Sequence, residues 1–153
     1  MNLQQSARDE ARHQAAIAAR GRNDAGWRVL VVDDEDAVRR LACASLTRAG
    51  FAVVAAHDGV EAVETIRGGE QTFDAVLLDM VMPRMTGADA CAIIKRLLPD
   101  LPVVLTSGQC EEDATARFEP GAIVGFVRKP FLASALVQAM DHAVRLHGRA
   151  ATS

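Results

Sequence analysis

The sequence predicts an α/β protein with a doubly wound, five-stranded parallel sheet. One observation is that five short runs are apolar at nearly every position, which is typical of strands buried on both faces. A second observation is that segments with helical spacing of apolar residues separate these runs. Alternation of strands with helices favours right-handed crossovers and parallel pairing, so helices should cover both faces of the sheet.

Each expected strand is a compact apolar run. The first follows Trp27 and leads into a pair of aspartates, and the third leads into Asp79. Glycine, proline or polar residues border the runs, which is typical of strand ends. The expected strands are residues 28–32, 51–56, 75–78, 102–106 and 123–127.

The segments between the strands have apolar residues on one side, as amphipathic helices do. Asp36 is expected to cap the first helix, and Gly50 and Pro99 are expected to end two of them. The fourth segment is short and acidic, and its helical pattern is the weakest. The expected helices are residues 36–49, 59–67, 88–98, 111–118 and 132–146.

The chain divides into one α/β domain with a short segment at each end. Residues 1–26 are rich in Ala, Gln and Arg, and only Leu3 and Ile17 are large aliphatic residues before Trp27. Such a segment has no broad apolar face to bury, so we expect a helical or disordered N-terminal lead. The α/β domain is expected over 27–147, and a disordered tail over 148–153.

Composition excludes several classes of protein. The 153 residues are 50% hydrophobic and carry a formal net charge of -3, so general attraction to nucleic acid or acidic membranes is not expected. No apolar run is long enough for a transmembrane helix, and the N-terminus lacks a secretory signal. The three cysteines are scattered and form no CxxC pair, which disfavours a disulfide framework or zinc site and favours the cytoplasm.

Chemically active side chains follow four of the expected strands. In open α/β sheets the ligand site lies outside the carboxyl ends of the strands. We therefore expect carboxylates, hydroxyls and one ammonium group to converge on a single edge of the sheet. These residues are Asp33, Asp34, Asp79, Thr106, Ser107 and Lys129.

This set of side chains favours magnesium and phosphoryl chemistry. Carboxylates within a few ångströms repel one another, and Lys129 supplies only part of the counter-charge they need. Oxygen ligands without His or Cys favour a hard cation, Mg²⁺ before zinc. A carboxylate beside such a cation and a lysine is a plausible nucleophile toward phosphorus, and a covalent aspartyl phosphate results.

Four sequence segments carry a family resemblance. They are VLVVDDE (29–35), LLDMVMPRMTG (77–87), VLTSG (104–108) and GFVRKPF (125–131). Together they resemble the receiver domain of two-component response regulators, over residues 28 to about 146. The resemblance implies a flavodoxin-like sheet with strand order 2-1-3-4-5. Locally, the segment 102–131 is similar to receivers of hybrid histidine kinases.

The resemblance also implies roles at the acidic site. Asp79 is expected to be the phosphoacceptor. Asp34 and Asp79 are expected to bind Mg²⁺ directly, with the backbone carbonyl of Val81 as a third ligand. Asp33 is expected to act through a magnesium-bound water.

Further implied roles fall on the fourth and fifth strands. Lys129 is expected to pair with a phosphoryl oxygen, and Lys129-Pro130 resembles the family's cis peptide junction. Ser107 is expected to bind another phosphoryl oxygen, since it is followed by Gly108 as in the family pattern, although Thr106 is a rival. Phe126 occupies the family's aromatic switch position.

The resulting prediction is a receiver that takes a phosphoryl group from a histidine kinase or histidine phosphotransfer domain and loses it by slow hydrolysis. Only 23 residues follow Pro130, too few for a DNA-binding output domain. We therefore expect output through contact with an unknown downstream protein, without DNA or membrane. The prediction also allows a homodimer, formed through the expected helix 111–118, the fifth strand and the last helix.

Three other functions are compatible with part of the sequence. A magnesium-dependent phosphohydrolase with an aspartyl nucleophile would need a second acid two residues after Asp79, where Val81 stands. A flavodoxin-like flavin binder would need a phosphate-binding loop after the first strand, where Asp33 and Asp34 would repel phosphate. The third is a receiver-like binding module that signals without phosphorylation.

Overall fold

The structure is a computed structural model that describes residues 26–152, so nearly all of the expected N-terminal lead lies outside the described residues. Five parallel strands form one sheet in the order β2-β1-β3-β4-β5. This order confirms the doubly wound fold that the sequence predicts. The strands are β1 (Arg28–Val32), β2 (Ala52–Ala56), β3 (Ala75–Asp79), β4 (Val103–Ser107) and β5 (Ile123–Arg128).

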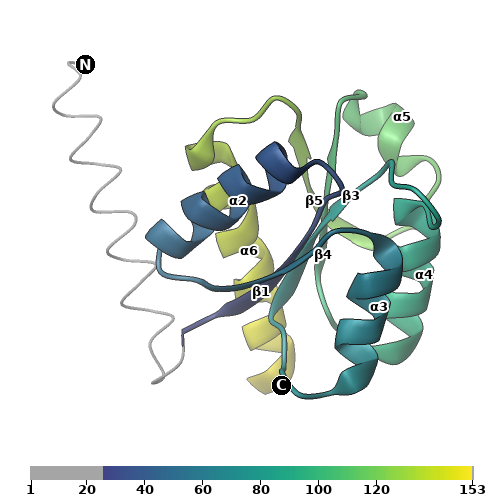
Figure 1. Ribbon diagram of the computed structural model, residues 1–153. Helices are drawn as coiled ribbons and strands as arrows, with labels where there is room; N and C mark the ends of the chain where they lie inside the picture. The colour runs from purple at the N-terminus through teal and green to yellow at the C-terminus, as the bar shows by residue number, and fades with distance from the viewer. Residues whose placement is uncertain (1–25, 153) are drawn as a thin grey trace, which may run out of the picture.

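Helices cover both faces of the sheet. In Figure 1, α2 and α6 lie against one face, whereas α3, α4 and α5 lie on the other. The helices are α2 (Asp36–Arg48), α3 (Gly59–Gly68), α4 (Gly87–Leu97), α5 (Glu111–Thr115) and α6 (Ala133–Thr152). Among residues 26–152, no helix combines the length and apolar character needed to cross a membrane.

The core lies in two layers, one on each side of the sheet. Alternate residues of β1 show this: Val29 and Val31 pack with α2 and α6, whereas Leu30 and Val32 pack with α3 and α4. Every residue of β3 is buried, because this strand lies in the middle of the sheet and has a helical layer on each face. The continuous apolar runs in the sequence reflect this double burial.

The first helix differs from the sequence prediction at its N-terminus. Asp36 is its first residue rather than its cap, and Glu35 occupies the cap position without a side-chain hydrogen bond to the helix. The Asp36 carboxylate instead accepts a hydrogen bond from Arg39, one turn later, at 2.5 Å. This pairing within the first turn replaces the expected capping bond.

The last two helices differ in length from the prediction. The α5 helix ends at Thr115 rather than Phe118, because the Phe118 N–H donates to the Thr115 carbonyl in a tight turn. The α6 helix continues past Leu146 through Thr152, into the segment expected as a disordered tail. Gly148 does not end it: a Cβ there would lie 2.9 Å from the Trp27 ring, so this glycine provides close packing.

The register of the strands aligns their carboxyl ends. Asp79 of β3 lies opposite Thr106 of β4, and Ser107 lies opposite Arg128 of β5. The chain then turns back tightly after β3, and a Cβ at Gly87 would lie only 2.5 Å from the Asp79 carbonyl oxygen. Glycine is therefore required at the start of α4 to bring this helix against the end of β3.

Candidate functional site

The carboxyl edge of the sheet brings three aspartates and one lysine together. Asp33 and Asp34 follow β1, and Asp79 ends β3. One carboxylate oxygen from each of them lies within 4.8 Å of the others. The ammonium nitrogen of Lys129, which follows β5, lies 2.8 Å from Asp33 Oδ2 and 3.3 Å from Asp79 Oδ1. The structure therefore brings together the charged residues that the sequence predicts at the carboxyl ends of the strands.

The aspartates differ in exposure. Asp33 and Asp79 are buried, whereas Asp34 is exposed. The Glu35 N–H donates to Asp33 Oδ1 at 2.9 Å, and an Arg39 guanidinium nitrogen donates to the Asp33 carbonyl at the same distance. Arg39 thus holds the turn after β1. Sequence reasoning missed this contact, although an arginine in the first turn of the helix that follows an acidic pair is a signal that could have found it.

Burial and repulsion dominate the electrostatics of the site. Burial, followed by the neighbouring charge of Asp33, raises the pKa of Asp79 from 3.8 to about 7, although Lys129 opposes both effects. Burial works against the charge on Lys129, but Asp33 and Asp79 outweigh it, so the pKa of Lys129 is raised. The lysine alone therefore leaves the cluster short of positive charge, and a bound cation would favour ionised Asp79.

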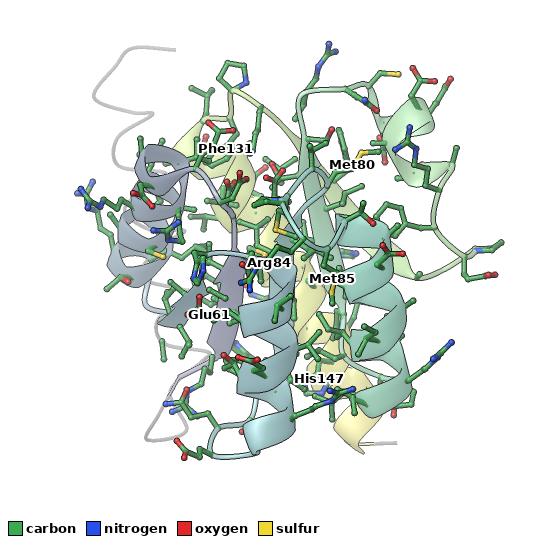
Figure 2. All side chains as sticks on the ribbon, turned by 45° about the vertical axis from the view of Figure 1, so that its right-hand side comes forward. Glu61, Met80, Arg84, Met85, Phe131 and His147 are labelled. Atoms are coloured by element: carbon green, nitrogen blue, oxygen red, sulfur yellow. The ribbon has the colours of Figure 1, made fainter. Side chains whose placement is uncertain are left out.

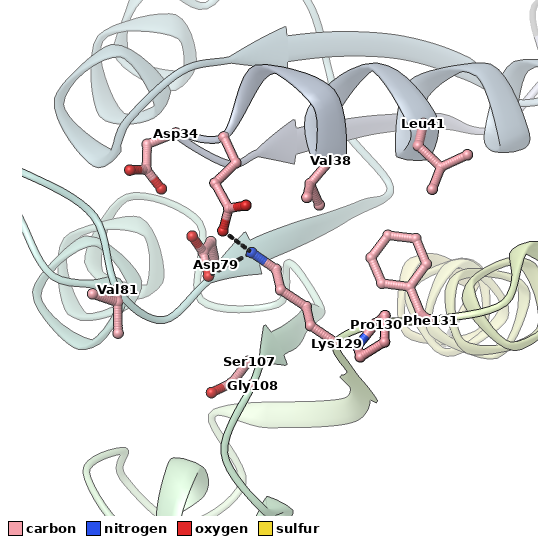
Figure 3. A pocket seen from close by; sticks show the side chains of 11 residues that line it. Asp34, Val38, Leu41, Asp79, Val81, Ser107, Gly108, Lys129, Pro130 and Phe131 are labelled. Atoms are coloured by element: carbon pink, nitrogen blue, oxygen red, sulfur yellow. Dashed lines mark hydrogen bonds and ion pairs between the residues drawn. The ribbon is translucent and has the colours of Figure 1, made fainter.

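A groove of about 590 Å³ opens over this cluster. Figure 3 shows Lys129 reaching toward Asp79 on one side of it, and Phe131 beside Val38 and Leu41 on the other. The groove thus has a charged part and an apolar part. Its lining residues are Asp34, Glu35, Val38, Leu41, Asp79, Val81, Ser107, Gly108, Lys129, Pro130 and Phe131.

The two hydroxyl residues at the end of β4 have different surroundings. Ser107 lines the groove, and its hydroxyl accepts a hydrogen bond from the Gln109 N–H at 3.0 Å. Thr106 is buried, does not line the groove, and its hydroxyl has no hydrogen-bond partner among the described residues. Successive residues of a strand point to opposite faces, which explains the difference. Of these two hydroxyl residues, Ser107 is the one that lines the groove.

The remaining predicted residues surround the cluster. Val81 is 67% exposed and lines the groove, and the Lys129–Pro130 peptide bond is cis. Phe126 is half-buried on β5 and packs beside a small cluster that contains Met80 and Leu105. It lies outside the groove lining.

Sequence reasoning also missed an acidic residue after β2, near the same edge of the sheet. Asp58 caps α3 by accepting a hydrogen bond from the Glu61 N–H, and it forms an ion pair with Arg84 in the loop after β3. Its place directly before Gly59, the first residue of α3, is a capping signal. The sequence gives no signal for its pairing with Arg84.

Comparisons with known proteins show the family to which the chain belongs. Residues 29–141 match the family model described as the response regulator receiver domain. Response regulator MprA of Mycobacterium ulcerans is 39% identical over 119 residues, which are 77% of this chain and 50% of that protein. The chain therefore spans about half the length of the curated relatives it matches.

Solved structures show the same fold. The receiver domain protein from Clostridium thermocellum has a TM-score of 0.74 at 25% identity, over 81% of this chain and 98% of that chain. NtrX from Brucella abortus has a TM-score of 0.72 at 28% identity, over 82% of this chain and 28% of that chain. Because the family model covers most of the sequence, the chain belongs to the response regulator receiver domains of two-component signalling.

Proposed function

We propose that Asp79 accepts a phosphoryl group from a phosphohistidine of a histidine kinase or phosphotransfer protein. The observation that carries this proposal is a buried carboxylate at the end of the central strand, beside Lys129 and at an open groove. An ionised Asp79 oxygen attacks phosphorus, the phosphorus–nitrogen bond breaks, and the leaving imidazole takes up a proton. Slow attack by water on the acyl phosphate returns free Asp79 and inorganic phosphate.

The acidic cluster suits Mg²⁺. Its donor atoms are carboxylate oxygens only, which magnesium prefers over softer metals. We assign direct contacts to Asp34, Asp79 and the carbonyl of Val81, and a contact through water to Asp33. When bound, Mg²⁺ supplies positive charge that offsets the negative charge of the phosphoryl oxygens.

The chain itself supplies the remaining contacts to the phosphoryl group. Lys129 already lies within 3.3 Å of Asp79, so its ammonium group can move to a phosphoryl oxygen with a small side-chain rotation. The Ser107 hydroxyl lines the same groove and can donate to a second phosphoryl oxygen. Such charge-assisted bonds are stronger than those between neutral groups, which makes them a suitable response to phosphorylation.

The apolar part of the groove gives the donor protein a surface to dock on. Leu41 is 53% exposed, and it lines the groove with Val38 and Phe131. An exposed apolar surface next to a charged site favours a protein partner over a free small molecule. A histidine presented from that partner would reach Asp79 through the same groove.

Movement of Ser107 and Lys129 would pass to β4 and β5, and from there to α5 and α6. The short α5 helix is the element most easily altered, since marginal elements respond first. We therefore place the output surface on α5, β5 with Phe126, and α6. This surface would contact the downstream protein or a second copy of the chain.

Phosphoryl uptake tests the proposed acceptor. Acetyl phosphate with Mg²⁺ should add the mass of one phosphoryl group to the intact protein, and chelation of the metal should prevent it. Asp79→Asn should gain no mass, because an amide cannot form the acyl phosphate. Asp89→Asn, which changes an exposed aspartate in the first turn of α4, is the matched control and should gain mass as the wild type does. Full uptake by Asp79→Asn would refute the assignment.

A further inference from the structure

The loop between β3 and α4, residues 80–86, makes a tight turn in its middle. At its ends, the Gly87 N–H donates to the Met80 carbonyl at 2.9 Å, and the Thr86 hydroxyl accepts from the Asp89 N–H at 3.2 Å. In the middle, the Met85 N–H donates to the Pro83 carbonyl at 2.8 Å. These bonds reverse the chain direction within a few residues.

Arg84 adopts an unusual backbone conformation at the centre of this turn. Its φ of 67° makes it the one non-glycine residue with a positive φ in the part of the chain that the structure describes. Side chains other than glycine disfavour this region, and such a conformation persists only where surrounding contacts impose it. A contact of Arg84 must therefore offset the energetic cost of this backbone conformation.

The Arg84 guanidinium group provides that contact by reaching the α3 helix. Figure 2 shows Arg84 close to the N-terminal end of α3, next to Met85 of the same loop. Its Nε donates to Asp58 Oδ2 at 3.1 Å, and its Nη2 contacts the same oxygen. The loop after β3 is thereby joined to a helix that lies far from it in sequence.

Asp58 is a fixed anchor for this contact. It is 2% exposed, and its other oxygen, Oδ1, accepts the capping bond from the Glu61 N–H at 2.8 Å. His57 Nε2 lies 3.4 Å from Asp58 Oδ2, and the other ring nitrogen, Nδ1, pairs with Glu61. A buried carboxylate needs a charged partner, and Arg84 is the permanently charged one among the described residues that pair with Asp58.

The same loop carries the backbone carbonyl proposed as a metal ligand. Val81 lies in the first half of the loop, and the buried Met82 separates it from the turn at Arg84. Met85 packs against α3, since a Cβ at Gly59 would lie 3.2 Å from its sulfur. The contacts of Arg84 and Met85 with α3 therefore determine where the loop lies above the acidic cluster.

We propose that Arg84, anchored on Asp58, is a positioning residue that fixes the β3–α4 loop and thereby sets the Mg²⁺ affinity of the site. This inference rests on the proposed function, in which the Val81 carbonyl binds the metal with Asp34 and Asp79. Arg84 touches neither the metal nor the phosphoryl group. It acts as outer residues of metal sites do, by holding a ligand in place.

The direction of the effect separates positioning from simple electrostatics. Arg84 is a cation on the same edge of the sheet as the metal site. If its charge acted only at long range, removing it would tighten Mg²⁺ binding. If it positions the loop, removing it weakens Mg²⁺ binding, because the carbonyl ligand is no longer held.

The test is calorimetric titration of Mg²⁺ into the wild type, Arg84→Gln, Arg84→Lys and Arg96→Gln. Arg84→Gln should bind Mg²⁺ roughly tenfold more weakly, which is the scale for loss of an outer residue. Arg84→Lys keeps the charge, so its Mg²⁺ affinity should fall less than that of Arg84→Gln. Arg96→Gln removes an exposed arginine of α4, and its affinity should stay within about twofold of the wild type, since distant exposed charges are screened.

Two further measurements complete the test. Asp58→Asn keeps the capping oxygen but removes the charge, so combining it with Arg84→Gln should weaken binding little beyond either change alone. In metal-free Arg84→Gln, amide exchange at Met85 should be faster than in the wild type. Unchanged or tighter Mg²⁺ binding by Arg84→Gln, or unchanged exchange at Met85, would overturn the positioning role. No saturable Mg²⁺ binding by the wild type itself would instead overturn the proposed metal site and this inference with it.

Discussion

The two ends of β3 each carry an aspartate, and the two carboxylates differ in their hydrogen-bond and ion-pair partners. Asp74 directly precedes the strand and Asp79 ends it. The strand between them is buried throughout, so both carboxylates are held by the same rigid element. Differences in their behaviour must therefore come from their neighbours rather than from the backbone that carries them.

The carboxylate of Asp74 is satisfied on both oxygens. Oδ2 accepts a hydrogen bond from the Arg28 N–H at 2.9 Å, and Oδ1 lies 3.1 Å from His147 Nδ1. The Asp74 N–H also donates to the Arg28 carbonyl at 2.7 Å. Asp74 thus joins the start of β1 to the end of α6 and stabilises the fold.

The carboxylate of Asp79 lies beside Asp33, and burial and this neighbouring charge raise its pKa to about 7. Asp79 forms an ion pair with Lys129, and this lysine is shared with Asp33 and Glu35. The Asp74 end of the strand thus stabilises the fold. The other end keeps an incompletely compensated charge, which a metal ion or a phosphoryl group can exploit.

The largest expected change in stability comes from Asp74→Ala. The substitution leaves the Arg28 N–H without its acceptor and removes the partner of His147. Loss of such bonds costs about 1–3 kcal/mol. Chemical denaturation should show a lower unfolding free energy, with Asp100→Ala, an exposed aspartate after α4, as the control that changes little. An unchanged unfolding free energy would mean that Asp74 does not join these elements.

A smaller change of opposite sign is expected from Asp79→Ala in metal-free protein at neutral pH. Removing this carboxylate relieves its repulsion with Asp33 and leaves Lys129 paired with Asp33 and Glu35. The unfolding free energy should rise by about 0.5–2 kcal/mol. Saturating Mg²⁺ should stabilise the wild type more than the variant, which reduces the difference. A destabilised variant would show that the cluster is not under repulsive strain.

The smallest expected change comes from Thr106→Val, next to Asp79 on β4. Because the buried Thr106 hydroxyl has no hydrogen-bond partner among the described residues, a methyl group in its place should raise the unfolding free energy by about 1 kcal/mol. Thr106→Ser keeps the hydroxyl and removes the methyl group, so it should be destabilised. Thermal melting of the two variants compares them directly. A destabilised Thr106→Val would indicate that the hydroxyl has a partner.

The sequence predicted the fold and the charged side of the site because both depend on local patterns. Double burial makes a strand such as β3 apolar at every position, and parallel strands bring their carboxyl ends to one edge. Asp33, Asp79 and Lys129 could therefore be grouped without knowing any contact distance. Their roles as phosphoacceptor and ligands come from the family resemblance and stay predictions.

Contacts between distant loops could not be predicted in this way. Arg84 and Asp58 are 26 residues apart, and His147 and Asp74 are 73 residues apart. No periodic pattern links such pairs, since side-chain packing alone selects them. The same reason explains Thr106: its residue type suggests a role in the site, but the direction of its side chain on β4 leaves it outside the groove lining.

The most direct test of the contrast between Asp74 and Asp79 is the unfolding free energy of metal-free wild type, Asp79→Ala and Asp74→Ala across pH. Because the pKa of Asp79 is raised from 3.8 to about 7 on folding, the folded wild type binds more protons in that range, and its stability falls as pH rises through it. Asp79→Ala should lack this fall. The excess of its unfolding free energy over that of the wild type should therefore grow from little near pH 4 to its maximum above pH 7. The unfolding free energy of Asp74→Ala should still fall as pH rises, as in the wild type, but from a lower value at acidic pH. The same pH dependence in wild type and Asp79→Ala would show that the Asp79 carboxylate is not the group under electrostatic strain.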